Sequence, residues 1–364
     1  MEAQPIPGVW VLLSRWDGTT YVAQSNEQGK YTIQGIPAGS YQPVAGAPGY
    51  GDERPGGLWG RVLVDPEVDT VVDIELLPKA PVEVAPGINL SLGDPTLLSC
   101  KEPMESQAVR RTITFATGDR YNQPAFLYTP GESVTDTVES PLPILLTVYP
   151  GPADTWECAS IPLADAGYAV LAVGPAYSLE LERDIDELGQ ILHFARKGDF
   201  PGADGERVAV LGGSYSAILV QRLLQRDSKI DASVLLGAPT DLFDLRRRFE
   251  QGSFIPPFGL DQVLIALGFP DREPLRYWTY SSVYHVSATL PPTILFHSYQ
   301  DDIVPYEQSE LLAEKLKAIG VEHELHLFNG ATHYLLSGDK ETKEIYRLTL
   351  DFLARHLRES QSDP

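Results

Sequence analysis

From residue 106 onward, short apolar runs alternate with longer amphipathic segments, and this alternation limits the fold more than any other feature of the sequence. The apolar runs have the length of buried strands, and the segments between them show helical spacing. The segment 179–196 illustrates the helical type, because its apolar residues fall at Leu181, Ile185, Leu188 and Leu192. Strands and helices in alternation form a mostly parallel sheet with helices on both faces. The sequence therefore predicts an α/β fold with a doubly wound, mostly parallel sheet over residues 106–364.

The boundaries of the individual elements follow from the same pattern. Strands are expected at residues 112–115, 125–128, 144–149, 168–173, 207–211, 232–236, 293–297 and 323–328. Helices are expected at residues 179–196, 216–226, 306–319 and 340–357. Between the strands at 232–236 and 293–297 lies an insert, at about 240–290, which we expect to act as a cap.

The first 80 residues show a different pattern, with short β-type runs separated by turn signals such as Asp17-Gly18 and Pro37-Ala38-Gly39. Strands are expected at residues 8–14, 20–24, 30–33, 41–45, 61–64 and 70–76. Together with Pro48-Gly49-Tyr50, these features resemble the carboxypeptidase regulatory-like, or prealbumin-like, domain. The resemblance implies a small, non-catalytic all-β sandwich over residues 1–80. The module's first strand and a signal peptide are expected upstream of Met1. Residues 81–105, rich in proline and glycine, are expected to be a linker.

Charge and hydropathy exclude several classes of protein. Lys plus Arg total 28 and Asp plus Glu total 50, so the net charge of −22 repels nucleic acids and anionic lipids. No apolar run reaches the 18 residues of a membrane span. We therefore expect a globular protein with a small-molecule ester or a short peptide as its substrate, and neither nucleic acid nor membrane as a partner.

The two cysteines, Cys100 and Cys158, lie in neither a C-x-x-C pair nor a His-flanked cluster. That spacing removes the usual zinc, haem and thioredoxin interpretations, and it leaves one disulfide or two free thiols. A disulfide would indicate an oxidising compartment. The expected location is therefore secreted or extracytoplasmic.

The segment 208–217 reads as a buried strand that turns abruptly into a helix, with Ser214 at the turn. Such an elbow holds a nucleophilic serine with its oxygen exposed. Small residues are needed at Gly212 and near Ser216, because the turn brings the strand and helix backbones together. Ser216 replaces the second glycine of the usual G-x-S-x-G pattern and is small enough to fit. The alternative is an ordinary strand-to-helix turn.

A nucleophilic serine needs a histidine as its base and a carboxylate to orient that histidine, and both follow Ser214 in the required chain order. Asp301 and Asp302 lie in the loop after the strand at 293–297, and His333 lies in the loop after the strand at 323–328. Catalytic groups gather at such strand ends. His333 is the expected base, and the residues alone leave the acid open between Asp301 and Asp302.

Residues 106–358 resemble the α/β-hydrolase fold, most closely its prolyl oligopeptidase-like branch. The matching segments are residues 148–152, 212–216, 297–305 and 330–333. The resemblance selects Asp301 as the acid and implies that the Tyr149 hydroxyl is one oxyanion donor. The backbone N–H of Tyr215 is the other donor. The alternative for Tyr149 is a side chain packed at a strand end. This chemistry requires no metal and no organic cofactor.

The insert carries the residues that we expect to line a substrate pocket: Phe254, Phe258, Leu260 and Trp278. Core packing of a helical hairpin is the alternative for each of them. Peptidases of the resembling branch generally carry a large β-propeller, whereas about 100 residues of sandwich and linker precede the catalytic domain here. The sequence therefore favours a carboxylesterase acting on short-chain or aromatic acyl esters. A prolyl oligopeptidase-like exopeptidase is the first alternative, and a non-catalytic binding protein on a hydrolase scaffold is the second.

Overall fold

The structure of this chain is a computed structural model. It describes residues 4–51, 60–65, 67–79, 87–117, 120–121, 125–131, 141–174, 181–256, 260–335 and 341–357. The chain divides into two compact units, each made of two separate stretches of sequence. The first unit contains Met1–Val82 and Asp241–His285, and the second contains Glu83–Thr240 and Val286–Pro364.

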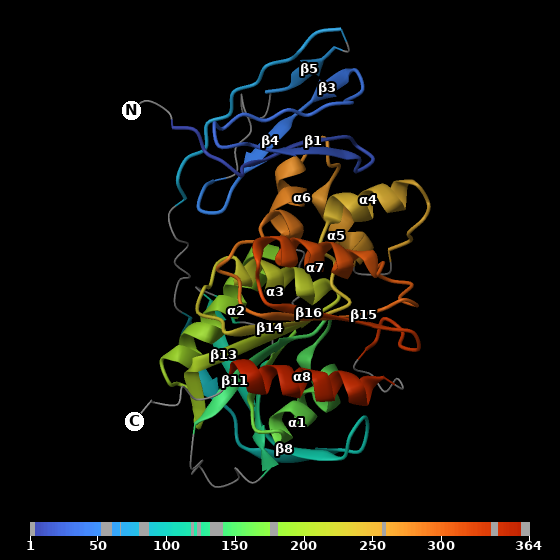
Figure 1. Ribbon diagram of the computed structural model, residues 1–364. Coiled ribbons are helices and arrows are strands. Elements are labelled where there is room, and N and C mark those ends of the chain that lie inside the picture. Colours follow the sequence, from blue (N-terminus) through green and yellow to red (C-terminus); the bar gives the residue numbers. More distant parts are fainter. Residues whose placement is uncertain are drawn as a thin grey trace. The chain divides into compact units, whose positions relative to one another are not determined.

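An eleven-stranded sheet forms the centre of the second unit (Figure 1). Its strands are β6 (Ile88–Leu92), β7 (Thr96–Cys100), β8 (Ser106–Thr117), β9 (Arg120–Tyr121), β10 (Ala125–Pro130), β11 (Leu142–Val148), β12 (Ala169–Val173), β13 (Ala203–Gly213), β14 (Ala232–Leu236), β15 (Thr293–Ser298) and β16 (His323–Phe328). The main order is β16-β15-β14-β13-β11-β12-β10-β8-β6, with β7 and β9 paired to β8. The six strands from β11 to β16 are parallel to their neighbours in that group, and β10, β8 and β6 pair antiparallel.

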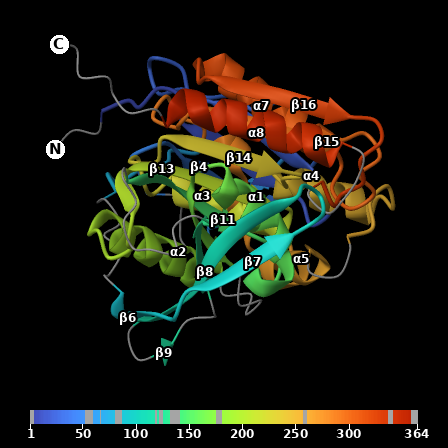
Figure 2. The same ribbon diagram turned by 90° about the horizontal axis from the view of Figure 1, so that it is seen from below.

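Five helices of the second unit cover both faces of this sheet: α1 (Glu157–Asp165), α2 (Leu181–Arg196), α3 (Tyr215–Leu224), α7 (Glu307–Ile319) and α8 (Thr342–His356). Helices α2, α3 and α7 lie on one face, and α1 and α8 lie on the other (Figure 1). Figure 2 views α1 and α8 in front of the strands that they cover. Because both faces are covered, β12, β14 and β15 are buried along their whole length, which is why they read as continuous apolar runs. The predicted doubly wound α/β fold is confirmed.

The parallel part of the sheet brings distant parts of the chain to one edge. Strands β11, β13, β14, β15 and β16 all run in the same direction, so the loops that follow them lie at the same end of the sheet. The residues that follow β11, β13, β15 and β16 include Tyr149, Ser214, Asp301 and His333. The fold therefore gathers the residues that the sequence analysis selected from positions up to 184 residues apart, counted from Tyr149 to His333.

The prediction of a linker over residues 81–105 is wrong for the described part from residue 87 on. Strands β6 and β7 lie within it, and both pair antiparallel with β8. Cys100, at the end of β7, forms a disulfide with Cys158 of α1, 58 residues further along the chain. The bonded alternative for the two cysteines is thus confirmed, and the extracytoplasmic location stays a prediction.

The amino-terminal part of the first unit is β-rich, as predicted. Its strands are β1 (Trp10–Ser14), β2 (Thr20–Gln24), β3 (Gly39–Tyr41), β4 (Pro43–Gly46) and β5 (Val62–Val64). They form a three-stranded sheet, β2-β1-β4, and a two-stranded sheet, β3-β5. No strand forms at the predicted positions 30–33 and 70–76, where Tyr31 donates its hydroxyl proton to the Val72 carbonyl at 2.8 Å instead. Tyr31, Ile33 and Ile74 still pack against the small core of Val9, Val11, Ala45 and Leu76.

The insert folds with this β-rich part in one unit, although the sequence analysis placed it in the catalytic domain. It contains α4 (Leu242–Glu250), α5 (Leu260–Leu267) and α6 (Pro274–Tyr280). Asp241 caps α4 by accepting hydrogen bonds from the N–H groups of Phe243 and Asp244. The ring of Trp10 in β1 meets the ring of Tyr284 edge to face, with the centroids 5.8 Å apart. The turn between β1 and β2 touches α4 at Gly18.

The close approach at Gly18 gives a matched pair of substitutions. Gly18 and Gly49 have φ values of +85° and +83°, so alanine is strained to the same degree at both. A Cβ at Gly18 would lie 2.5 Å from the Arg247 nitrogen and the Phe243 oxygen, whereas no described atom lies within 4 Å of a Cβ at Gly49. We expect Gly49→Ala to lower the free energy of unfolding by about 1 kcal/mol through backbone strain. Gly18→Ala should cost about 1–3 kcal/mol more, because it overpacks the contact with α4.

Urea unfolding followed by tryptophan fluorescence measures both losses. Equal losses for the two variants would contradict the packing of the β1–β2 turn against α4.

Candidate active site

Ser214 lies at a sharp turn between β13 and α3, as the elbow pattern predicted. Its backbone angles are φ 53° and ψ −130°, a left-handed conformation that is costly for a residue other than glycine. Its N–H donates a hydrogen bond to the carbonyl of Leu236, at the end of β14, over 2.8 Å. This bond fixes the turn to the neighbouring strand, so that the strained conformation is held from outside the turn.

The small residues on either side of Ser214 allow the strand and the helix to approach each other. A Cβ at Gly212 would lie 2.7 Å from Cγ2 of Val220 in α3, which leaves no room for a side chain. Ser216 is fully buried and donates its hydroxyl proton to the Tyr149 carbonyl at 2.7 Å. The serine that stands in place of the usual glycine therefore connects the elbow to the loop after β11.

The structure brings Ser214, His333 and Asp301 into a hydrogen-bonded line. The Nδ1 atom of His333 lies 2.7 Å from Oδ2 of Asp301, and its Nε2 atom lies 2.8 Å from Oγ of Ser214. A carboxylate oxygen only accepts, so Nδ1 carries the proton and Nε2 presents its lone pair to the serine hydroxyl. Asp302 is exposed, and the aspartate that contacts His333 is Asp301. The geometry thus decides between the two aspartates that the residues alone left open.

The carboxylate of Asp301 is enclosed by hydrogen-bond donors. Its side chain has no exposed surface, and its Oδ1 atom accepts the N–H groups of Ile303 at 2.9 Å and Val304 at 2.7 Å. Burial opposes ionisation, but hydrogen bonds from His297 and His333 outweigh it and hold the pKa of Asp301 below its ordinary value. Asp301 is therefore a carboxylate at neutral pH, which is the form that orients an imidazole and stabilises its positive charge.

Sequence reasoning missed His297, which it regarded as structural. Its Nε2 atom lies 3.2 Å from Oδ2 of Asp301, the same oxygen that faces His333. The signal was present in the sequence, because His297 is a polar residue at the carboxyl end of an apolar strand and four positions before the acid.

Ser298 links the loop that carries the acid to the loop that carries the histidine. Its hydroxyl accepts the N–H of Gln300 at 3.0 Å and donates its proton to the carbonyl of Ala331, two residues before His333. Glycine is usual at this position in the family that the sequence resembles, and glycine would supply neither bond. The departure from that pattern thus adds a connection between the Asp301 and His333 loops.

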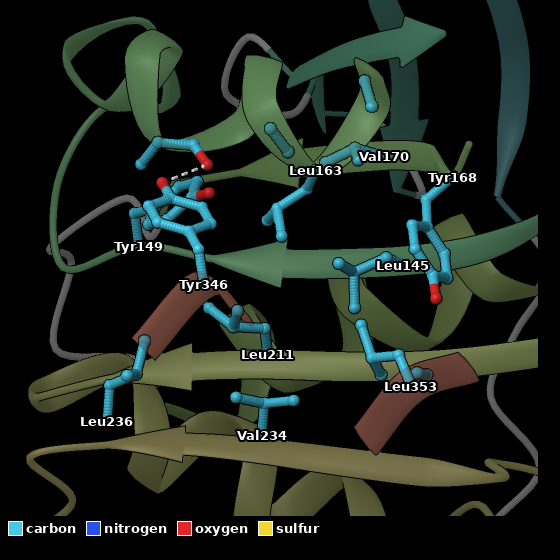
Figure 3. Packing of buried hydrophobic residues seen from close by; sticks show 14 of the residues in the cluster. Leu145, Tyr149, Leu163, Tyr168, Val170, Leu211, Val234, Leu236, Tyr346 and Leu353 are labelled. Atoms are coloured by element: carbon cyan, nitrogen blue, oxygen red, sulfur yellow. Dashed lines mark hydrogen bonds between the residues drawn. The ribbon is translucent and has the colours of Figure 1, made fainter. Parts of the chain in front are cut away.

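The Tyr149 hydroxyl does not occupy an oxyanion position, so the structure favours the alternative that was left open for this residue. Figure 3 shows the Tyr149 ring inside the core, with its hydroxyl bonded to Ser160 of α1 at 3.1 Å. The ring stacks on Trp156 with the centroids 5.3 Å apart, and the residue is only 2% exposed. Burial raises the pKa of Tyr149 to about 12. A donor to a substrate oxygen has to reach the accessible side of Ser214, and a hydroxyl enclosed in the core does not.

Backbone N–H groups are the donors that remain near the elbow. Tyr215 directly follows Ser214 and begins α3, so its N–H belongs to the first turn of that helix, where backbone N–H groups have no carbonyl partner in the helix itself. In the loop after β11, Pro150 and Pro152 have no N–H, which leaves Gly151 between them. The N–H of Gly151 has no acceptor among the described residues.

The residues predicted to line a pocket are buried in the first unit. Trp278 has no exposed surface and stacks on Tyr284 with the centroids 5.1 Å apart. Phe254 and Leu260 are buried as well, and Phe258 lies outside the described residues. Core packing, the alternative in the sequence analysis, accounts for Trp278, and a pocket role for the others stays a prediction.

Two sequence models of known families match this chain. Residues 183–360 match the prolyl oligopeptidase family, and residues 2–77 match the carboxypeptidase regulatory-like domain. The first match begins in α2 and includes Ser214, Asp301 and His333. Both resemblances found in the sequence are thereby confirmed.

Curated relatives match over part of their own length. The uncharacterized peptidase YuxL of Bacillus subtilis is 26% identical over 258 residues, which are 66% of this chain and 38% of that protein. The isoprenylcysteine alpha-carbonyl methylesterase of Arabidopsis thaliana is 40% identical over 47 residues, 13% of this chain and 11% of that protein. This chain therefore spans less than two thirds of the length of either relative.

Solved structures share the fold. Acylaminoacyl peptidase of Pyrococcus horikoshii aligns with a TM-score of 0.55 and 16% identity, over 96% of this chain and 61% of that one. The acetyl ester-xyloside bifunctional hydrolase of Caldicellulosiruptor lactoaceticus aligns with a TM-score of 0.50 and 23% identity, over 66% of this chain and 90% of that one. At these identities the likeness shows the α/β-hydrolase fold. In the part of the chain that the structure describes, no helix has the length and apolar character to cross a membrane.

The strained backbone at Ser214 predicts different stabilities for two variants that both lack the hydroxyl. Ser214→Gly should be more stable than Ser214→Ala, because glycine adopts the angles of the turn without the strain of about 1–3 kcal/mol that another residue bears. Glycine loses about 0.4–1 kcal/mol of this gain through the greater freedom of its unfolded chain. We therefore expect a net difference of about 1 kcal/mol in the free energy of unfolding.

Thermal unfolding of the two variants side by side measures this difference. An alanine variant as stable as the glycine variant would show that the turn at Ser214 stores no strain.

Proposed function

This chain belongs to the prolyl oligopeptidase family through residues 183–360 and is a serine hydrolase, and from that premise we propose that it hydrolyses carboxylic esters with short or aromatic acyl groups. The observation that carries the proposal is the line of hydrogen bonds from Asp301 through His333 to Ser214, at 2.7 and 2.8 Å. In this proposal the three residues form a catalytic triad. Ser214 is the nucleophile, His333 is the base and Asp301 is the acid that orients it.

The first half of the reaction forms an acyl-enzyme. His333 Nε2 takes the proton of Ser214 while the serine oxygen attacks the carbonyl carbon of the ester. The ionised Asp301 stabilises the imidazolium that results, through the bond to Nδ1. The imidazolium then gives its proton to the departing alcohol oxygen, and the serine remains acylated.

The second half hydrolyses the acyl-enzyme. Water takes the place of the alcohol, His333 removes its proton, and the hydroxyl oxygen attacks the acyl carbon. Collapse of the tetrahedral intermediate breaks the bond to Ser214 and releases the carboxylic acid. Each step uses the same base, and no step requires a metal or an organic cofactor.

Two backbone donors support the ester class. We assign the oxyanion to the N–H of Tyr215 and the N–H of Gly151, which come from the elbow and from the loop after β11. Lipases and esterases of this fold use the N–H after the nucleophile and an N–H from the equivalent loop. The resemblance to the peptidase branch implied a tyrosine hydroxyl instead, and the Tyr149 hydroxyl is held in the core by Ser160.

The segment next to the catalytic domain also supports ester hydrolysis. Residues 2–77 match a carboxypeptidase regulatory-like domain, and the described strands of this part form sheets of three and two strands. The part of the chain that adjoins the hydrolase sheet is therefore not a propeller of the kind that selects peptides. A peptidase is the second candidate, and the family match and the name of the Bacillus subtilis relative support it.

A paired assay distinguishes the two candidates. The substrates are p-nitrophenyl acetate, butyrate and octanoate, beside Ala-Pro and Gly-Pro p-nitroanilides. We expect rapid ester turnover with negligible anilide cleavage, and a loss of at least about 10⁴-fold in kcat for Ser214→Ala, because the nucleophile is gone. Efficient cleavage of the anilides would favour the peptidase. Full activity of Ser214→Ala would refute the proposed nucleophile.

The neighbouring aspartates supply a matched control for that assay. Asp301→Asn should lower kcat by about 10⁴-fold, since an amide does not hold the imidazole in the required tautomer. Asp302→Asn removes the same charge one residue away from an exposed position and should leave kcat within about twofold. A fluorophosphonate probe that fails to label the wild-type protein would instead favour the non-catalytic alternative.

Tyr149→Phe tests the assignment of the oxyanion donors. A hydroxyl that bonded the oxyanion would cost about 10²–10³-fold in kcat when removed. We expect kcat to change by less than about threefold, and the free energy of unfolding to fall by about 1 kcal/mol, because Ser160 loses its partner in the core. Ester kinetics and urea unfolding of the purified variant measure the two effects. A loss of kcat above 10²-fold would restore the tyrosine hydroxyl to the oxyanion site.

A further inference from the structure

His297 is a fully buried histidine that the triad mechanism leaves without a role. It lies near the carboxyl end of β15, where its side chain has no exposed surface. All the polar atoms of its ring have partners. Nε2 lies 2.9 Å from the carbonyl oxygen of Val304 and 3.2 Å from Oδ2 of Asp301, and Nδ1 lies 2.7 Å from Oγ of Ser309 in α7.

These partners determine where the ring carries its proton. The Val304 carbonyl and the Asp301 carboxylate only accept hydrogen bonds, so Nε2 is the protonated nitrogen and donates to both. In a neutral ring Nδ1 is then an acceptor, and the hydroxyl of Ser309 donates to it. Ser309 is 1% exposed, so water has little access to this bond. The hydroxyl thus holds His297 in the tautomer that directs an N–H at Asp301.

Two imidazoles therefore bond the same oxygen of the acid. Oδ2 of Asp301 accepts from His333 at 2.7 Å and from His297 at 3.2 Å. The other oxygen, Oδ1, accepts the N–H groups of Ile303 and Val304. His297 also bonds the Val304 carbonyl, so its N–H joins the end of β15 to both the carboxylate and the turn that holds it.

We propose that His297, with its tautomer fixed by Ser309, is a positioning residue that holds the Asp301 carboxylate in the orientation in which Oδ2 receives the His333 N–H. The inference rests on the proposed function, since it assigns a role within the same triad. His297 touches neither the substrate nor Ser214, and it acts through Asp301. Without it, Oδ2 keeps His333 as its single side-chain donor, and the carboxylate has one fewer restraint against rotation.

The alternative is that His297 only fills space and satisfies its own polar atoms in the core. Both roles predict a loss of stability when the ring is removed, so stability does not separate them. A positioning role also predicts a lower kcat at an unchanged KM, because the orientation of His333 matters in the transition state and not in substrate binding. It further predicts that a side chain with an N–H in the place of Nε2 restores activity.

The experiment compares His297→Leu, which has no donor, with His297→Gln, whose amide places an N–H near the position of Nε2. His323→Leu is the matched control, because His323 is a half-buried histidine at the other end of the adjacent strand β16 and bonds the Val321 carbonyl at 2.9 Å. Kinetics on p-nitrophenyl butyrate are measured with the full-length proteins, with active sites counted by a fluorophosphonate probe.

For His297→Leu we expect kcat per labelled site to fall about 10–100-fold while KM stays within about twofold of the wild type. His297→Gln should recover most of that loss, and His323→Leu should retain the wild-type kcat. A kcat of His297→Leu equal to that of the wild type, or of His297→Gln equal to that of His297→Leu, would overturn the proposal.

Ser309→Ala tests the same idea with a smaller change, and it serves where His297→Leu does not fold. It leaves the His297 ring in place but frees its tautomer, so kcat should fall about 3–10-fold at constant KM. An unchanged kcat for Ser309→Ala would refute the role of the tautomer. Failure of the proposed function itself is recognised separately, because the wild type would then neither label with the probe nor turn over an ester.

Discussion

The turn at Ser214 is the constraint on which the organisation of the site depends. A serine at φ 53° is unfavourable by itself, and three contacts outside the turn hold it there. Gly212 lets α3 pack directly on β13, the Ser214 N–H bonds the end of β14, and the Ser216 hydroxyl bonds the loop after β11. These contacts come from three adjacent parallel strands, so the geometry of the nucleophile is a property of the whole sheet and not of the local motif.

Features that depend on local pattern were predictable from the sequence. The apolar runs of β11, β12, β14 and β15 are buried on both faces, and such strands leave a continuous signal in the sequence. Ser214, Asp301 and His333 followed from the positions of loops relative to those strands. The order of strands in a parallel sheet then brings the loops together, and no side-chain detail is needed for that step.

Features that depend on the direction of a side chain, or on contacts between distant segments, were not predictable in the same way. Tyr149 matched a family pattern in which its hydroxyl is a catalytic donor, and the competing partner, Ser160, lies eleven residues away in a helix with no motif of its own. His297 lies next to the acid through the curvature of a turn. The strands β6 and β7 escaped notice because proline and glycine dominate the composition around them, although both pair with β8.

The union of the β-rich part and the insert in one unit has a consequence for how the chain acquires its structure. Trp10 and Tyr284 are in contact but 274 residues apart in the sequence, so the first strands to leave the ribosome wait for most of the chain before their packing is complete. Most of the hydrolase sheet is synthesised in that interval. The amino-terminal segment is thus incomplete during translation, and a chain cut after the β-rich part would lack one half of the unit to which that part belongs.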